Sequence, residues 1–309
     1  HLEFKVLDVN QGGAVLGVSY DFEKAVHQEE LGGSGSYGFE LRVKANGTAA
    51  FDRDRNPEDF LVSSLSVDFY GSHGGTTGKV TPEQSRALER MGREMADIKD
   101  KEALLRSDLW RDFNRFVQDH LSTQVYVELG LAASLESNQS FSEKQYAFEA
   151  TAGLDVKAWN TGSLEAHLNL LDYPAALLRV LSGYDERLTI RGSTWPTVIG
   201  AVGWVNPHDD DPRSLAGDRS GYWRLRAEAS FRTPVARIAG SAVHVNANLR
   251  YYHEIHAERA VRTAGVDRYT YYSIDVASEK GVYVGYSAGK LPFDAEKDQV
   301  YEAGLRVNF

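Results

Sequence analysis

The sequence predicts an all-β protein, a transmembrane antiparallel up-and-down β-barrel of about 12–14 strands with one α-helical insert. Apolar and polar residues alternate over many segments of about ten residues, the length that crosses a bilayer at a tilt. Aromatic residues stand at the ends of the apolar faces, as expected at the two interfaces of a membrane. The sequence contains no run of about 18 apolar residues, which is the length that a transmembrane helix needs. We therefore expect residues 1–309 to form a single barrel domain.

The alternation is clear in residues 243–252, where Val243 and Leu249 share one face and Asn246 and Arg250 share the other. The same pattern occurs in residues 14–24, 36–45, 60–70, 123–135, 146–158, 163–171, 223–232, 268–276, 281–289 and 299–309. It is weaker in residues 2–9, 186–191 and 197–205. Each of these segments is expected to be a strand with one face against lipid.

An antiparallel β-sandwich would also alternate, but its strands are usually about five or six residues long. The aromatic residues at the strand ends also favour a barrel, because they match the girdles of membrane barrels. These residues are Tyr37, Phe69, Tyr146, Trp223, Phe231, Tyr251, Tyr272, Tyr301 and Phe309.

The last eight residues carry a polar residue, a glycine, a hydrophobic residue and a final aromatic at Glu302, Gly304, Val307 and Phe309, with Tyr301 just before them. This spacing resembles the β-signal of Gram-negative outer-membrane β-barrel proteins. The resemblance implies an outer-membrane location and recognition of this strand by the barrel-assembly machinery. It implies no activity.

Composition narrows the function further. The chain has 309 residues, a net charge of −10 and no cysteine, which excludes disulfides, thiolate zinc sites and thiol nucleophiles. The negative charge argues against nucleic acid as a partner, and no cofactor is predicted. The mean hydropathy of −0.40 fits a barrel, in which only every second residue faces lipid. The chain begins at His1, as a mature protein would after removal of an export signal.

Such barrels have an even number of strands, with both termini in the periplasm. The count is 14 if residues 2–9 and 186–191 are both strands and 12 if neither is, and we favour 14. Short turns are expected on the periplasmic side and longer loops outside. This parity places the helical insert in the periplasm.

The insert covers residues 81–121. Thr81-Pro82-Glu83-Gln84 is a capping box with proline at the first helical position. Apolar residues then follow at helical spacing: Leu88, Met91, Met95, Ile98, Leu105, Leu109, Phe113, Phe116 and Val117. Three roles remain open for this insert: a periplasmic cap on the barrel end, a plug or gate in the lumen, and a surface for a periplasmic partner.

With the apolar face outward, the inward residues are strongly charged. A basic lane is predicted from Arg224, Arg226, Arg232, His244 and Arg250, joined elsewhere by Arg306, Arg42 and Lys44. Acidic residues are predicted on other strands, at Glu128, Glu149, Asp155 and Glu165. We expect the two groups on different walls, because several strands separate them. Either they neutralise one another in a filled lumen or they line water, and the cost of burying unpaired charge favours water.

These features predict an outer-membrane channel or transporter for small hydrophilic solutes or ions, with the insert as a candidate gate. The competing functions are an outer-membrane enzyme, either a lipid hydrolase or a protease, and a non-conducting envelope scaffold. No strand places Ser and His at i and i+2, as a hydrolase site on one face would need. The run 72–79 lacks the first glycine and the final hydroxyl residue of a phosphate loop. The expected partners are outer-membrane lipid and small solutes.

Overall fold

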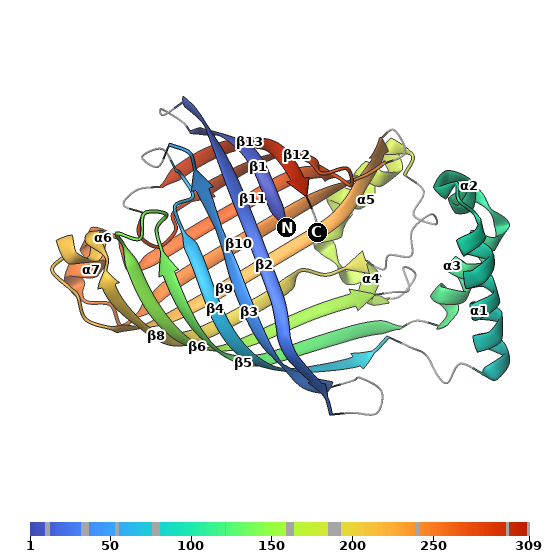
Figure 1. The fold of residues 1–309 in the computed structure, drawn as a ribbon, viewed down its shortest axis with the longest axis horizontal. Coiled ribbons are helices and arrows are strands. Elements are labelled where there is room, and N and C mark those ends of the chain that lie inside the picture. The colour runs from blue at the N-terminus through green and yellow to red at the C-terminus, as the bar shows by residue number, and fades with distance from the viewer. Residues whose placement is uncertain are drawn as a thin grey trace.

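The computed structural model describes residues 1–9, 13–31, 37–52, 56–75, 81–120, 122–158, 164–184, 193–238, 241–294 and 297–307. Twelve antiparallel strands follow one another around a barrel, which closes where β1 pairs with β13 (Figure 1). The strands are β1 (Leu2–Val9), β2 (Gly13–Glu30), β3 (Tyr37–Ala50), β4 (Leu61–Gly74), β5 (Thr123–Ser137), β6 (Lys144–Ala158), β8 (Thr197–Asp209), β9 (Tyr222–Ile238), β10 (Ser241–Ile255), β11 (Arg268–Ser278), β12 (Val282–Gly289) and β13 (Asp298–Val307). The two-residue β7 (Ser193–Thr194) adds a short pairing to β6. The predicted fold class is confirmed.

The barrel has 12 strands, but they are not the strands of the predicted 12-stranded alternative. Residues 2–9 do form a strand, whereas 163–171 do not. In their place are the helix α4 (Leu164–Leu168) and the 3-10 helix η2 (Leu170–Asp172). The segment 186–191 lies outside the described residues. Our preference for 14 strands was therefore wrong, and β6 pairs directly with β8.

The faces of the strands follow the predicted alternation. On β9, Trp223 and Leu225 are exposed on the outside, whereas Arg224 between them is buried. On β13, Tyr301 and Leu305 are exposed and Glu302 turns inward to Lys5. Trp204 and Trp223 meet edge to face at one end of the apolar outer surface, with ring centroids 5.9 Å apart. This outer surface is the part of the barrel suited to lipid.

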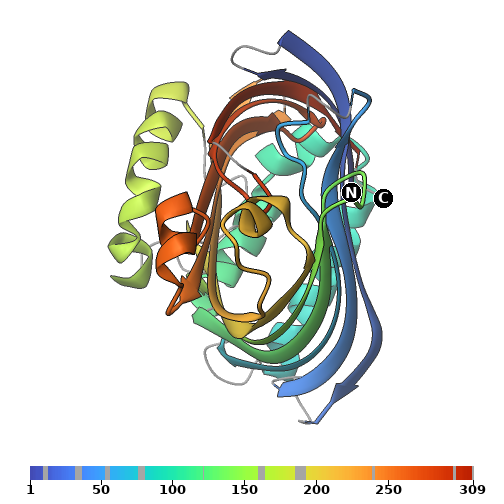
Figure 2. The ribbon, with the colours of Figure 1, turned by 90° about the vertical axis from the view of Figure 1, so that its left-hand side faces the viewer.

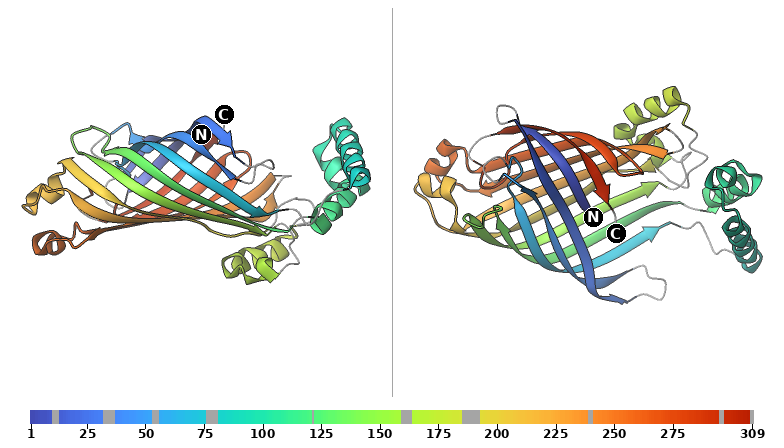
Figure 3. Two further views of the ribbon diagram at one scale, coloured as in Figure 1. Left: turned by 90° about the horizontal axis from the view of Figure 1, so that it is seen from below. Right: turned by 45° about the horizontal axis from the view of Figure 1, so that its top comes forward.

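The helices divide between the two ends of the barrel (Figures 1 and 3). At one end, here called the helical end, lie α1 (Pro82–Asp97), α2 (Lys101–Arg106), α3 (Asp108–His120), α4 and α5 (Tyr173–Ser182). At the other, the loop end, lie α6 (Asp211–Leu215) and α7 (Arg259–Ala264). In the described residues, no helix is both long and apolar enough to cross a membrane.

The predicted insert is helical and begins as expected. Thr81 caps α1, with Gln84 N donating to Thr81 Oγ1 at 3.2 Å and Thr81 N donating to Gln84 Oε1 at 2.8 Å. The helices α1 and α3 pack on each other, which covers part of the apolar stripe. All three helices lie beyond the end of the barrel and not inside it (Figures 1 and 3). The insert is therefore no lumen plug in this structure.

Replacing Leu249 with Arg should destabilise the barrel by about 2–4 kcal/mol, because Leu249 is exposed on the outer face midway along β10 and the new charge would meet lipid near the middle of the bilayer. Ser230 is the matched control, since it lies at the same height on the neighbouring strand β9 and lines the inner cavity. Ser230→Arg should be tolerated. The free energy of unfolding is measured by urea titration of the protein in lipid. Equal losses for the two variants would show that the faces are assigned wrongly.

Candidate functional site

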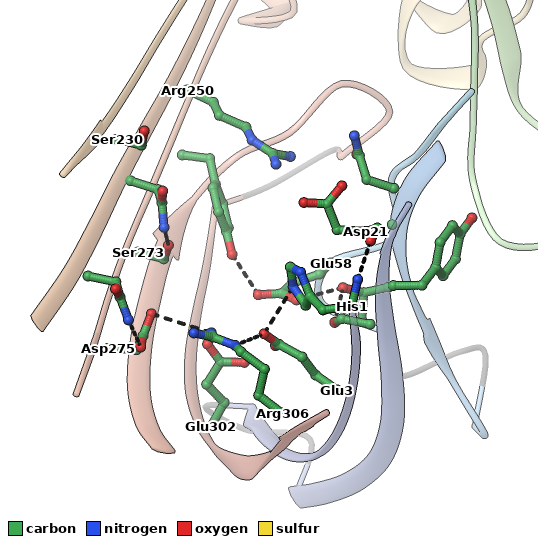
Figure 4. A pocket seen from close by; sticks show the side chains of 18 of the residues that line it. His1, Glu3, Asp21, Glu58, Ser230, Arg250, Ser273, Asp275, Glu302 and Arg306 are labelled. Carbon is green, nitrogen blue, oxygen red and sulfur yellow. Dashed lines mark hydrogen bonds and ion pairs between the residues drawn. The ribbon is translucent and has the colours of Figure 1, made fainter. Parts of the chain in front are cut away.

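A polar cavity of about 460 Å³ lies inside the barrel (Figure 4). Its wall is built by inward side chains of strands on both sides of the barrel, and it includes charges of both signs. The charged lining residues are His1, Glu3, Lys5, Asp21, Lys44, Glu58, Arg232, Arg250, Asp275, Glu302 and Arg306. Exposed residues of this wall, such as Ser230 and Arg232, lie in the half of β9 that leads to the helical end. The cavity is therefore wetted from that side.

Towards the loop end, the segment 56–60 folds into the barrel and closes the cavity. Glu58 is 7% exposed and both of its carboxylate oxygens are fully used. Oε2 accepts from Lys5 Nζ at 2.5 Å and from Thr48 Oγ1 at 3.0 Å. Oε1 accepts from Tyr271 Oη at 2.5 Å and from Ser287 Oγ at 3.2 Å. These partners come from β1, β3, β11 and β12, so one side chain ties the segment to both walls.

An apolar cluster, next to the hydrogen bonds of Glu58, closes the loop end of the barrel. Phe60 packs edge to face on Tyr252 and also contacts Phe293, with ring centroids 6.2 and 6.0 Å apart. The cluster consists of Phe60, Tyr252, Ala257, Val261, Val266, Tyr269, Leu291 and Phe293. Its members come from the segments before β4 and β13, from α7 and its flanks, and from the adjoining ends of β10 and β11, so three loops are held together. Burial of these side chains stabilises the closed arrangement.

The predicted basic lane is not a separate wall. Arg224 is buried between Glu136 and Glu149, with N–O distances of 2.6 and 3.0 Å. Arg226 pairs with Glu149 at 2.8 Å and with Glu228 at 2.9 Å. The expected separation of basic from acidic walls is therefore wrong here. It fails because only β8 lies between β6 and β9, whereas the sequence reading placed further strands there.

A second network lies on the adjoining part of the wall, formed by β2, β3 and β5. Arg42 on β3 lies 3.0 Å from Glu128 on β5, and it also contacts Glu40 and Glu23. Lys44 lines the cavity and lies 3.9 Å from Glu23. Both basic residues thus point inward as the alternation indicated, and here too they meet carboxylates. These basic side chains are stabilised by the carboxylates with which they pair, so they do not each require contact with a water-filled pore.

The remaining predicted lumen residues separate into three groups. Arg306 pairs with Glu3, lies 3.9 Å from Asp275 and, like Arg232, lines the cavity. His244 and Asp155 lie on the inward faces of β10 and β6 but do not line it. Glu165 is an exposed residue of α4, so its assignment to the lumen is wrong. Residues 164–170 satisfy period two with alternating leucines, and this short pattern was mistaken for a strand.

Arg250 differs from the other basic residues of the barrel. Its guanidinium points into the cavity (Figure 4), and within the described part of the chain it makes no hydrogen bond or ion pair. Glu228 and Glu58 are near enough only to act on it electrostatically at longer range. Arg250 therefore presents a positive charge that a solute could meet directly.

Two central residues of the site, Lys5 and Glu58, were not singled out from the sequence, and Glu302 was singled out only as part of the β-signal and not as a lumen residue. The ammonium of Lys5 lies between two carboxylates, 2.5 Å from Glu58 Oε2 and 3.1 Å from Glu302 Oε2. The inward parity of the first and last strands could have indicated Lys5 and Glu302. Glu58 lies in a connection without periodicity, and no sequence signal marked it.

The last strand has the expected faces. Tyr301 points outward, and Glu302 inward to Lys5. Gly304 is required by close packing, because a Cβ there would lie 2.4 Å from the Phe4 carbonyl and 2.9 Å from the Tyr283 ring. Val307 pairs with Leu2 at the closure of the barrel, and Phe309 lies outside the described residues. Recognition of this strand during assembly stays a prediction.

The loop end should loosen as the pH rises through about 7. Burial raises the pKa of Asp294 to about 7; nearby Asp298 and Asp59 add to the rise, and a hydrogen bond from Leu291 N and the charge of Lys290 oppose it. The folded state thus favours the protonated acid, so its stabilising contribution is full below about pH 4 and is lost above about pH 7. Hydrogen exchange of residues 290–294, corrected for the intrinsic rate, should accelerate over this range. Asp294→Asn should remove the pH dependence, and an unchanged profile in that variant would contradict the assignment.

No protein-family model matches the chain, and no curated protein does. Among solved structures, the chain is similar to the KdgM porin, at 7% identity over 99% of both chains and a TM-score of 0.29. It is also similar to the β domain of the Bordetella autotransporter BrkA, at 12% identity over 100% of this chain and 97% of that one, with a TM-score of 0.25. A mutant of the Rh. blastica porin matches at 11% identity over 100% and 98%, with a TM-score of 0.23. The likeness concerns the fold alone: like these proteins, the chain forms a closed antiparallel β-barrel.

Proposed function

We propose that this barrel lies in the outer membrane and is a channel for small hydrophilic solutes or ions, closed at its loop end in the present conformation. The polar cavity inside the barrel carries the proposal. A barrel that served only as a scaffold could fill this space with apolar side chains, whereas a wetted charged lining suits the passage of polar solutes.

We propose that the loops gate the channel, and the position of the helical insert argues against it as the gate. The segment 56–60 is tied across the lumen by Glu58, and the apolar cluster around Phe60 covers it. The insert lies beyond the opposite end (Figure 1). With both termini in the periplasm, the helical end is periplasmic and the cavity fills from there. The α1–α3 helices are then free to meet a periplasmic partner.

Arg250 favours anions in this proposal, because its charge faces the cavity without a partnering carboxylate in contact. Single-channel recording in planar bilayers tests the function. Arg250→Glu should shift the reversal potential in a salt gradient towards cation selectivity. The shift should be larger at low salt, where screening is weaker.

Arg111→Glu is the matched control, because it makes the same charge change on the exposed face of α3. It should leave the selectivity unchanged. If both variants shift the selectivity equally, the charge of the whole protein decides it and Arg250 has no special role. If neither the purified protein nor a variant that frees the segment 56–60, such as Glu58→Ala, conducts ions, the channel proposal fails and a scaffold or an enzyme takes its place.

The assembly route is part of the same proposal. β13 supplies the strand that closes the barrel against β1 and carries the residues resembling the β-signal. This supports recognition by the barrel-assembly machinery. Lipid then surrounds the apolar outer surface.

A further inference from the structure

The burial pattern of helix α5 is the reverse of that expected for a surface helix of a soluble protein. Its buried residues are Ala175 and Arg179. Its exposed residues are apolar and large, with Leu177, Leu178, Val180 and Leu181 exposed by 60, 49, 77 and 74%. A surface helix of a soluble protein turns its apolar stripe to the core and its charges to the solvent. Here the arginine faces the protein and the leucines face away from it.

The polar face of α5 is anchored to the outside of β9. Arg179 Nη1 donates to the Pro234 carbonyl at 2.9 Å and to Thr233 Oγ1 at 3.1 Å. Asp172 Oδ2 lies 2.5 Å from Arg179 Nη2, and Ser182 Oγ donates to the Val235 carbonyl at 3.1 Å. The views agree that this helix, yellow-green in Figures 2 and 3, lies outside the barrel wall. These bonds hold the helix in one orientation, with its leucines turned outward.

The height of α5 on the barrel fits the edge of a membrane. Trp223 belongs to the aromatic pair at the loop end of the apolar surface. Thr233 lies ten residues further along β9, which corresponds to about 23 Å along the axis for a strand tilted by about 45°. The apolar band of such barrels is about 25 Å tall. The anchor of α5 therefore lies at the far rim of the same band.

The segment before α5 extends the apolar surface. Leu164, Leu168, Leu170 and Leu171 are 54–70% exposed, and they lie on α4 and η2, which precede α5 in the chain. Together the exposed residues of 164–181 form what we call the leucine rim. From it we infer that the segment 164–182 lies in the membrane interface at the helical end and binds the acyl chains of that leaflet. The rim is continuous with the outer surface of β9, which supplies the argument for lipid as its occupant.

Nitroxide labels test the inference. The chain has no cysteine, so one introduced cysteine carries the only label. Leu178→Cys is compared with Leu225→Cys on the outer face of β9 and with Arg111→Cys on the exposed face of α3. The proteins are reconstituted in vesicles of phosphatidylethanolamine and phosphatidylglycerol. The label at Leu178 should be more accessible to oxygen than to a water-soluble nickel complex, as at Leu225, and Arg111 should show the opposite ratio.

Each outcome decides the question. A water-like ratio at Leu178 with a lipid-like ratio at Leu225 overturns the inference and leaves the membrane location of the barrel intact. A water-like ratio at both positions overturns the membrane location itself. Protection from both reagents, or dipolar broadening between labels at Leu178, would mean that protein covers the rim and that lipid is not its occupant. The test does not depend on conduction, so its failure is distinguishable from failure of the channel proposal.

Discussion

Replacing Glu58 with Ala is expected to open the loop end of the barrel and raise its conductance. The carboxylate is the one group of segment 56–60 that reaches Lys5, Tyr271 and Ser287 together. Hydrogen bonds to a charged group contribute about 1.5–3 kcal/mol each, and about 1.4 kcal/mol is tenfold in an equilibrium. The fraction of time spent open should therefore rise on the order of tenfold or more. Single-channel recording measures this fraction directly.

Glu58→Gln is the matched control, because the amide keeps the shape and part of the hydrogen bonding of the carboxylate. It should open the channel less than Glu58→Ala does. Lys5 keeps a carboxylate in both variants, since Glu302 lies 3.1 Å from it. If Glu58→Ala leaves the open fraction unchanged while the protein stays folded, the segment 56–60 is not the gate.

The outer surface of the barrel could be predicted from the sequence almost completely, and the interior only in part. Period two fixes which side of a strand faces outward, so the outward positions of Trp223, Leu225 and Tyr301 were predicted correctly. Period two says nothing about which strands are neighbours. The pairing of Arg224 with Glu149 depended on β8 being the one strand between them.

Two further features had no signal that could be recognised in the sequence. Glu58 lies in a connection, and its partners come from four strands spread along the chain. The segment 164–170 alternates as a strand would, yet it is helical and leads into Pro174 in the first turn of α5. A helix with exposed leucines and a strand with exposed leucines share an apolar composition. Only the structure separates them.

The second large effect is expected at Glu136. Its carboxylate lies 2.6 and 2.7 Å from the two terminal nitrogens of Arg224, and the two side chains are 4 and 2% exposed. Glu136→Ala leaves the guanidinium buried with Glu149 alone at 3.0 Å. Breaking a buried pair from one side costs about 3–5 kcal/mol, and here the guanidinium stays out of water and loses the carboxylate that binds both of its terminal nitrogens. The free energy of unfolding in lipid should fall by about this amount.

An exposed ion pair on the insert gives the comparison. Asp112 and Arg115 lie 4.0 Å apart, with side chains 66 and 76% exposed, so Asp112→Ala should cost less than about 1 kcal/mol. The double variant Glu136→Ala/Arg224→Met should recover most of the loss, since it removes the stranded charge and its partner together. A small effect of Glu136→Ala, equal to that of Asp112→Ala, would mean that water reaches Arg224 freely. The charged interior near β9 would then be part of the wetted lumen, and the passage would extend beyond the present cavity.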